Sequence, residues 1–85
     1  MNKDLRKQIL TELKSGHSYY YIVDSITGYI FNYAYPNNNT YPTFETQQYK
    51  NILNDVIQFY DLKYKVGLTN NQFIDLFQNL TYIKQ

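Results

Sequence analysis

The chain contains no cysteine and no tryptophan, and its 85 residues include only three glycines, two prolines and one histidine. The absence of cysteine excludes a disulfide scaffold, a thiolate metal site and a cysteine nucleophile. His17 has no second histidine to join it, so we expect neither a histidine-based metal site nor a bound cofactor. Without a glycine-rich phosphate loop or a convincing catalytic triad, the sequence predicts a protein that is not an enzyme.

Charge is also scarce. Eight Lys and Arg residues against seven Asp and Glu residues give a formal net charge of +1. This balance provides no strong field toward nucleic acid or a membrane surface. No apolar run is long enough to cross a membrane, and the first residues do not resemble a signal peptide. We therefore expect a cytoplasmic protein with no membrane partner.

Tyrosine, in contrast, is abundant: the chain has eleven, and seven of them lie between residues 19 and 41. The high content of Asn, Tyr, Ile and Lys is typical of an AT-rich genome, such as that of a low-GC bacterium, its phages or its plasmids. Packing of a core more often uses Leu, Ile or Phe. The tyrosine excess therefore favours a surface that binds another molecule.

Residues 18–35 are rich in aromatic and β-branched residues, a composition that predicts an antiparallel β-hairpin. Its turn would run from Asp24 to Gly28, where glycine can adopt a positive φ angle. Because side chains alternate along a strand, one face would enter the core, carrying Tyr20, Ile22, Tyr29, Phe31 and Tyr33. The other face would stay open, carrying Tyr19, Tyr21, Val23, Ile30, Asn32 and Ala34. A register slip of one residue would exchange the two faces.

Three amphipathic helices are predicted around this hairpin. The first covers about residues 3–14 behind an Asn2 N-cap, and the second runs from about residue 44 or 45 to Lys65. Thr69 and Gln72 form a capping box for a third helix that extends to about Leu80. The proline-bounded connector over residues 36–43 offers Thr40 and Tyr41 for a short third edge strand.

Together these elements predict one α+β domain over residues 1–85. It would consist of an N-terminal helix, the hairpin and two C-terminal helices, with the helices packed on one face of the sheet.

Two kinds of binding compete as the function of such a domain. The first is a non-catalytic module that occupies the surface of a host protein, as a phage or mobile-element accessory protein does when it inhibits a host enzyme such as a defence nuclease. Tyrosine is enriched at interaction hot spots, so the expected contact residues are Tyr19, Tyr21, Ile30, Asn32, Asn38 and Tyr41. The same open face would also suit a symmetric homodimer.

The second kind is nucleic-acid binding. Tyrosines of the sheet would stack on bases while cations of the first helix contact phosphates, namely Lys3, Arg6, Lys7 and Lys14. The near-neutral net charge makes this the weaker alternative, because such binding normally needs a basic groove.

Overall fold

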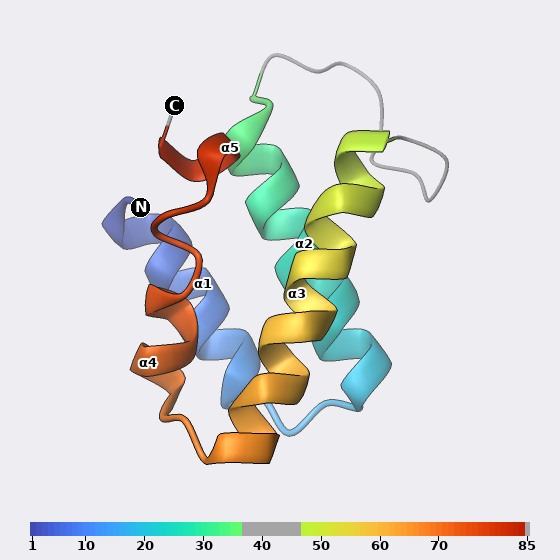
Figure 1. Cartoon of the computed structure of the whole chain (residues 1–85), viewed down its shortest axis with the longest axis vertical. Coiled ribbons are helices and arrows are strands. Elements are labelled where there is room, and N and C mark those ends of the chain that lie inside the picture. Colours follow the sequence, from blue (N-terminus) through green and yellow to red (C-terminus); the bar gives the residue numbers. More distant parts are fainter. Residues whose placement is uncertain (37–46, 85) are drawn as a thin grey trace.

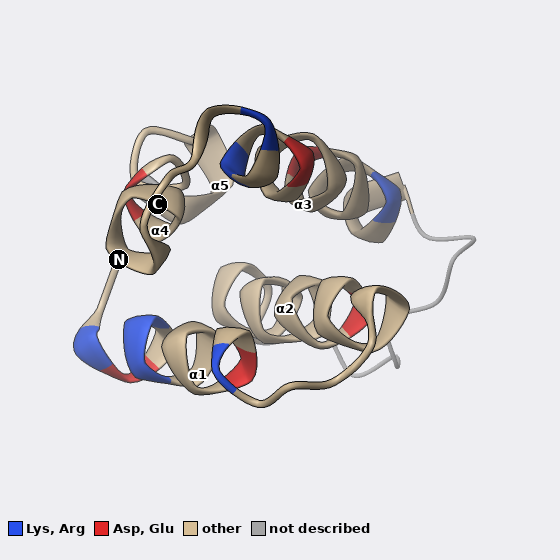
Figure 2. Cartoon of the chain, turned by 90° about the horizontal axis from the view of Figure 1, so that it is seen from below, with Lys and Arg blue, Asp and Glu red and all other residues tan. Residues whose placement is uncertain are grey.

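The computed structural model describes residues 1–36 and 47–84, and every regular element in these two ranges is a helix. The helices are α1 (Lys3–Leu13), α2 (Tyr19–Ala34), α3 (Gln47–Val66), α4 (Asn70–Asp75) and α5 (Thr81–Lys84). The first four alternate in direction along the bundle (Figure 1). Seen from below, α1 and α2 form one layer and α3, α4 and α5 form the other (Figure 2). Helix α2 contacts α1, α3 and α5, and so lies at the centre of the fold.

The predicted hairpin, and with it the α+β fold, is wrong, because residues 19–34 form α2 and the described residues include no strand. The buried residues of α2 come in adjacent pairs four positions apart: Ile22 and Val23, Ile26 and Thr27, Ile30 and Phe31. Neighbouring residues of a strand point to opposite faces, whereas pairs spaced by four share one face of a helix. The proposed turn lies inside this helix, and Gly28 is not among the glycines with positive φ.

Packing explains why this segment is helical despite its β-type composition. A β-branched or aromatic residue loses only about 0.7 kcal/mol or less of helix propensity relative to alanine. Burying a Val, Ile or Phe side chain contributes about 1.5–3 kcal/mol. Helix α2 buries five such side chains together with Thr27. Burial therefore outweighs local propensity, and the Ser18 side chain caps the helix by accepting a hydrogen bond from the Tyr21 N–H at 3.4 Å.

The helix starts predicted at Asn2 and Thr69 are confirmed, whereas the start predicted at residue 44 or 45 lies outside the described residues, within which α3 begins at Gln47. The Asn2 side chain caps α1 by accepting a hydrogen bond from the Leu5 N–H at 2.8 Å. The capping box at α4 is also present, with Gln72 N–H donating to Thr69 Oγ1 at 3.1 Å and Thr69 N–H donating to Gln72 Oε1 at 2.9 Å. Both caps satisfy N–H groups that a helix start leaves without a partner.

The helix predicted to reach Leu80 is shorter than expected. Helix α4 ends at Asp75, and the chain continues in tight turns closed by bonds from residue i+3 to residue i, such as Leu76 N–H to the Phe73 carbonyl at 3.1 Å. These turns end where α5 begins. Phe77 in the turns and Ile83 in α5 are both buried, so the core continues beyond the end of α4.

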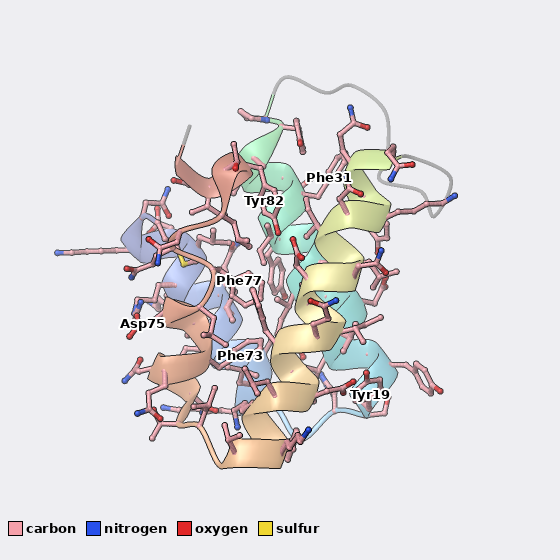
Figure 3. All side chains as sticks on the ribbon, viewed as in Figure 1. Tyr19, Phe31, Phe73, Asp75, Phe77 and Tyr82 are labelled. Atoms are coloured by element: carbon pink, nitrogen blue, oxygen red, sulfur yellow. The ribbon has the colours of Figure 1, made fainter. Side chains whose placement is uncertain are left out.

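Aromatic rings fill the space between the two layers (Figure 3). Phe31, Phe73 and Phe77 are almost completely buried. Phe73 packs edge-to-face on Phe77 with ring centroids 5.2 Å apart, and on Tyr60 at 5.9 Å. Such arrangements add about 0.5–1.5 kcal/mol to the burial of each pair. The core therefore joins α2, α3 and the C-terminal helices.

Hydrogen bonds from tyrosine to carboxylate also connect the helices. Tyr29 of α2 donates to Glu12 of α1 at 3.3 Å, and Tyr82 of α5 donates to Asp55 of α3 at 2.8 Å. Two more connect α2 with α3: Tyr49 Oη to Asp24 Oδ1 at 2.5 Å, and Tyr19 Oη to Asp61 Oδ1 at 3.3 Å. Bonds to charged groups are stronger than neutral ones. Part of the tyrosine excess is therefore structural.

Candidate functional site

An open groove of about 710 Å³ lies between the start of α2 and the middle of α3. We call it the aromatic groove, and its lining consists of Ser18, Tyr19, Tyr20, Tyr21, Val23, Asp24, Leu53 and Ile57. Most of this lining is apolar or aromatic. Val23, Leu53 and Ile57 belong to the core or pack against it, so the wall they form is continuous with the interior.

The Ser18 cap determines how the three tyrosines are presented. Consecutive residues of a helix point about 100° apart, so Tyr19, Tyr20 and Tyr21 point in different directions from the first turn of α2. Tyr19 turns toward α3, where its ring packs on Tyr60 with centroids 5.5 Å apart and its hydroxyl donates to Asp61. Tyr19 is therefore held in place and forms a fixed side of the groove.

Tyr20 and Tyr21, in contrast, are turned toward solvent. Tyr20 is 81% exposed and Tyr21 is 53% exposed. Tyr20 packs edge-to-face on Tyr19 at 5.3 Å, and Tyr21 packs on the His17 ring at 4.1 Å. Each ring is thus supported on one side and free on the other. A large aromatic surface that the fold leaves open in this way is suited to binding.

Asp24 is the one charged residue in the lining of the aromatic groove. Its Oδ1 atom accepts the hydrogen bond from Tyr49, and no described residue contacts its Oδ2 atom with a hydrogen bond or ion pair. Burial and the Asp61 carboxylate raise the pKa of the Tyr19 phenol above its ordinary value, so Tyr19 is a neutral donor at physiological pH. The site therefore offers rings, apolar side chains and carboxylates.

A cluster of polar side chains where α1 connects to α2 holds the two helices together. The buried Glu12 carboxylate accepts from Ser15 Oγ at 3.0 Å and lies 2.8 Å from His17 Nδ1, while Tyr29 donates to its other oxygen at 3.3 Å. Burial alone would raise the pKa of Glu12, but these hydrogen bonds and the charge of His17 outweigh it and lower the pKa. The cluster therefore holds His17 against Tyr21.

The structure separates the contact residues expected from the hairpin. Tyr19 and Tyr21 lie together in the aromatic groove, but Ile30 is completely buried in the core. Asn32 is exposed three turns further along α2, where it lines a small crevice with Asn2 of α1. Helix geometry causes this separation, because Ile30 points about 180° away from Tyr21 and Asn32 lies about 16 Å further along the axis than Tyr21. Asn38 and Tyr41, like the proposed third strand, lie outside the described residues.

Six lining residues are not among the contact residues expected from the sequence: Ser18, Tyr20, Val23, Asp24, Leu53 and Ile57. Tyr20 was expected in the core, and Asp24 was expected in a turn. The signal that identifies them is the four-residue spacing of Ile22, Ile26 and Ile30, which makes the segment a helix and places Tyr20 and Asp24 away from its buried stripe.

The four cations of α1 do not form a single patch. Lys3, Arg6 and Lys7 line a shallow hollow near the start of the helix. Arg6 is engaged there by Asp75 at 3.0 Å and by Asn71 at 3.5 Å. Lys14 follows the last residue of α1, about 10 Å along the axis from Lys7 at 1.5 Å per residue. Asp75 and Tyr19 lie on opposite sides of the molecule (Figure 3), so the Arg6 pair is far from the aromatic groove.

The described residues contain no cluster of His, Cys, Asp and Glu that would hold a metal ion. Within the same ranges, none of the helices has both the length and the apolar character needed to cross a membrane. Comparison with family models, curated proteins and solved structures found no match.

Proposed function

We propose that this protein is a non-catalytic module that binds a short segment of another protein in the aromatic groove. The observation that carries the proposal is the pair of exposed rings, Tyr20 and Tyr21, beside an apolar wall of Val23, Leu53 and Ile57. Tyrosine is enriched at binding hot spots because it offers a large contact area with few rotatable bonds.

The groove is also organised before binding. The Ser18 cap fixes the first turn of α2, and Tyr19 is tied to α3 through Asp61 and Tyr60. A prearranged site loses less conformational entropy when a partner binds. Its volume of about 710 Å³ lies within the range of ligand pockets, about 300–1,000 Å³, and so has room for a few side chains. These features support a short segment as the occupant.

Nucleic-acid binding receives less support. The tyrosines of the groove have no Lys or Arg beside them in the lining, and the cations Lys3, Arg6 and Lys7 lie at a different site. Binding to a phosphate backbone depends on cations that follow the strand.

The comparisons give no support to a mobile-element origin or to inhibition of a host enzyme. The cytoplasmic location stays a prediction that fractionation of source cells would test.

Site-specific crosslinking tests the proposal. A photoreactive phenylalanine analogue at position 20 should crosslink to a protein in a lysate of the source cells, and the same analogue at position 64 serves as the control. Tyr64 is comparably exposed, at 68%, but does not line the groove. Tyr21→Ala should weaken the purified complex by about 1–3 kcal/mol. Equal crosslinking from both positions, or unchanged affinity of the Tyr21→Ala variant, would contradict the proposal.

A further inference from the structure

The charged groups that the structure places at the aromatic groove are carboxylates, and Lys50, three residues before Leu53 on α3, is not part of its lining. Asp24 belongs to its lining, and Asp61 accepts the Tyr19 hydroxyl at its side. The lining includes no Lys or Arg, and helix α2 carries none at any of its 16 positions (Figure 2). A groove with this distribution favours a partner that brings positive charge.

Each of these two carboxylates has an oxygen to spare. Oδ1 of Asp24 accepts from Tyr49 and Oδ1 of Asp61 accepts from Tyr19. The Oδ2 atoms of both have no hydrogen bond or ion pair with any described residue. The tyrosine bonds orient the carboxylates without neutralising their charge, which leaves an acceptor for an incoming N–H group.

The tyrosine rings provide a second attraction for a cation. The face of an aromatic ring carries negative potential, and a cation within about 6 Å of its centroid is attracted to it. The chain itself provides an example outside the groove, where Lys63 Nζ lies 5.1 Å from the centroid of the exposed Tyr64 ring. Among the described residues no cation covers Tyr20 or Tyr21 in the same way. Their rings are therefore available to a cation from another molecule.

The apolar wall of the groove favours a cation that is carried on an aliphatic stem. Lysine and arginine pack their aliphatic stems on apolar surface while the charged group remains near water or an acceptor. Val23, Leu53 and Ile57 can cover such a stem, and Asp24 stands at the same groove to meet the head group. A guanidinium suits this site better than an ammonium, because it stacks on rings and bonds carboxylates with two N–H groups at once.

We infer that the aromatic groove binds a peptide segment that presents an arginine or lysine next to an apolar residue, with the cation attracted by Asp24 in the lining, by the negative charge of Asp61 at the side of the groove and by the exposed face of a tyrosine ring. This inference rests on the proposed function, since it identifies the chemistry of the segment that the module binds. A second copy of this chain is the competing occupant.

Selection from a displayed library of random 12-residue peptides tests the inference with the intact chain as bait. We expect the selected peptides to carry arginine or lysine beside aliphatic or aromatic residues. A synthetic selected peptide should bind about three- to tenfold more weakly to Asp24→Asn and to Asp61→Asn. Both variants keep an oxygen that can accept the tyrosine hydrogen bond. Asp4→Asn removes the same charge from exposed α1 and should leave affinity unchanged.

The outcomes separate this inference from the proposed function. Replacing the peptide's cation by norleucine should reduce binding about as much as Asp24→Asn does. Peptides whose binding depends on Tyr20 and Tyr21 but not on a cation would overturn the inference and leave the proposed function standing. If no selected peptide depends on those tyrosines for binding, both the inference and the proposed function are wrong. A dimer in sedimentation equilibrium that Tyr20→Ser abolishes would assign the groove to a second copy, and would also overturn the inference.

Discussion

The tyrosines fall into two groups that differ in what surrounds the ring and the hydroxyl. Tyr49 and Tyr60 are each 4% exposed and hydrogen-bonded, to Asp24 and Tyr64 respectively, whereas Tyr20 is 81% exposed and no described residue bonds its hydroxyl. Burial and the bond to Asp24 raise the pKa of Tyr49 well above its ordinary value. The same residue type thus stabilises the fold at one position and offers a surface at another, and the helix face decides which.

The largest effect should come from removing an interior ring. Tyr49→Ala would leave a cavity between α3 and α2 and deprive Asp24 of its donor. Loss of a buried aromatic side chain typically costs about 3–5 kcal/mol. Chemical denaturation measures this cost, and Tyr49→Phe provides the control that keeps the ring. A loss below about 1 kcal/mol for Tyr49→Ala would mean that Tyr49 belongs to the surface group.

A smaller effect is expected from removing one hydroxyl. Tyr82→Phe keeps the ring between α5 and α3 but removes the donor that lies 2.8 Å from Asp55 Oδ2. Bonds to a charged group contribute about 1.5–3 kcal/mol when buried, and this pair is partly exposed, so we expect a loss of about 1–2 kcal/mol. In the Asp55→Asn background the same change should cost less, as a double-mutant cycle would measure. Equal losses in both backgrounds would show that the bond contributes little.

The contacts of Glu12 with His17, Ser15 and Tyr29 predict a contribution to stability that depends on pH. The folded pKa of Glu12 lies below its reference value of 4.5, so its contribution is complete above about pH 4.5 and is lost as the pH falls through the folded pKa. Glu12→Gln should therefore lower stability at pH 7 and flatten the fall in stability below pH 4.5. Denaturation at a series of pH values measures both. The same acid dependence in both proteins would contradict this role for Glu12.

The sequence predicts the helix boundaries better than the central element. Asn2, the capping box at Thr69 and the end of α3 at Gly67 are local signals, fixed by hydrogen bonds within a few residues. Gly67 has a φ of 75° and the Leu68 N–H reaches back to the Lys63 carbonyl at 2.9 Å, a common helix ending. Such signals do not depend on the rest of the fold.

Helix α2 could not be assigned from composition because its tyrosines and β-branched residues favour a strand locally. Its conformation depends on α1, α3 and α5, which cover its buried pairs on several sides. The wrong assignment of α2 as a hairpin also made the predicted contact residues of the candidate site partly wrong. Tyr19 and Tyr21 both line the groove, but their place beside Leu53 and Ile57 depends on the packing of α2 on α3, which is distant in the sequence.

The smallest effect on stability, and the sharpest contrast between the two groups, is expected at Tyr20. Tyr20→Ala should change the free energy of unfolding by no more than about 0.5 kcal/mol, the usual range for a surface substitution. Its ring touches Tyr19 but is otherwise exposed, so the folded state loses little packing. The same substitution should weaken binding to a peptide selected on the intact chain by about 1–3 kcal/mol. Tyr64→Ala is the control for binding, because Tyr64 is 68% exposed and lies outside the groove, and it should leave affinity for the peptide unchanged. Its stability is not part of the control, since the substitution removes the hydroxyl that pairs with buried Tyr60. If Tyr20→Ala unfolds the protein as severely as Tyr49→Ala, the two groups are not distinct. If it changes neither stability nor binding, the exposed rings are not the binding surface.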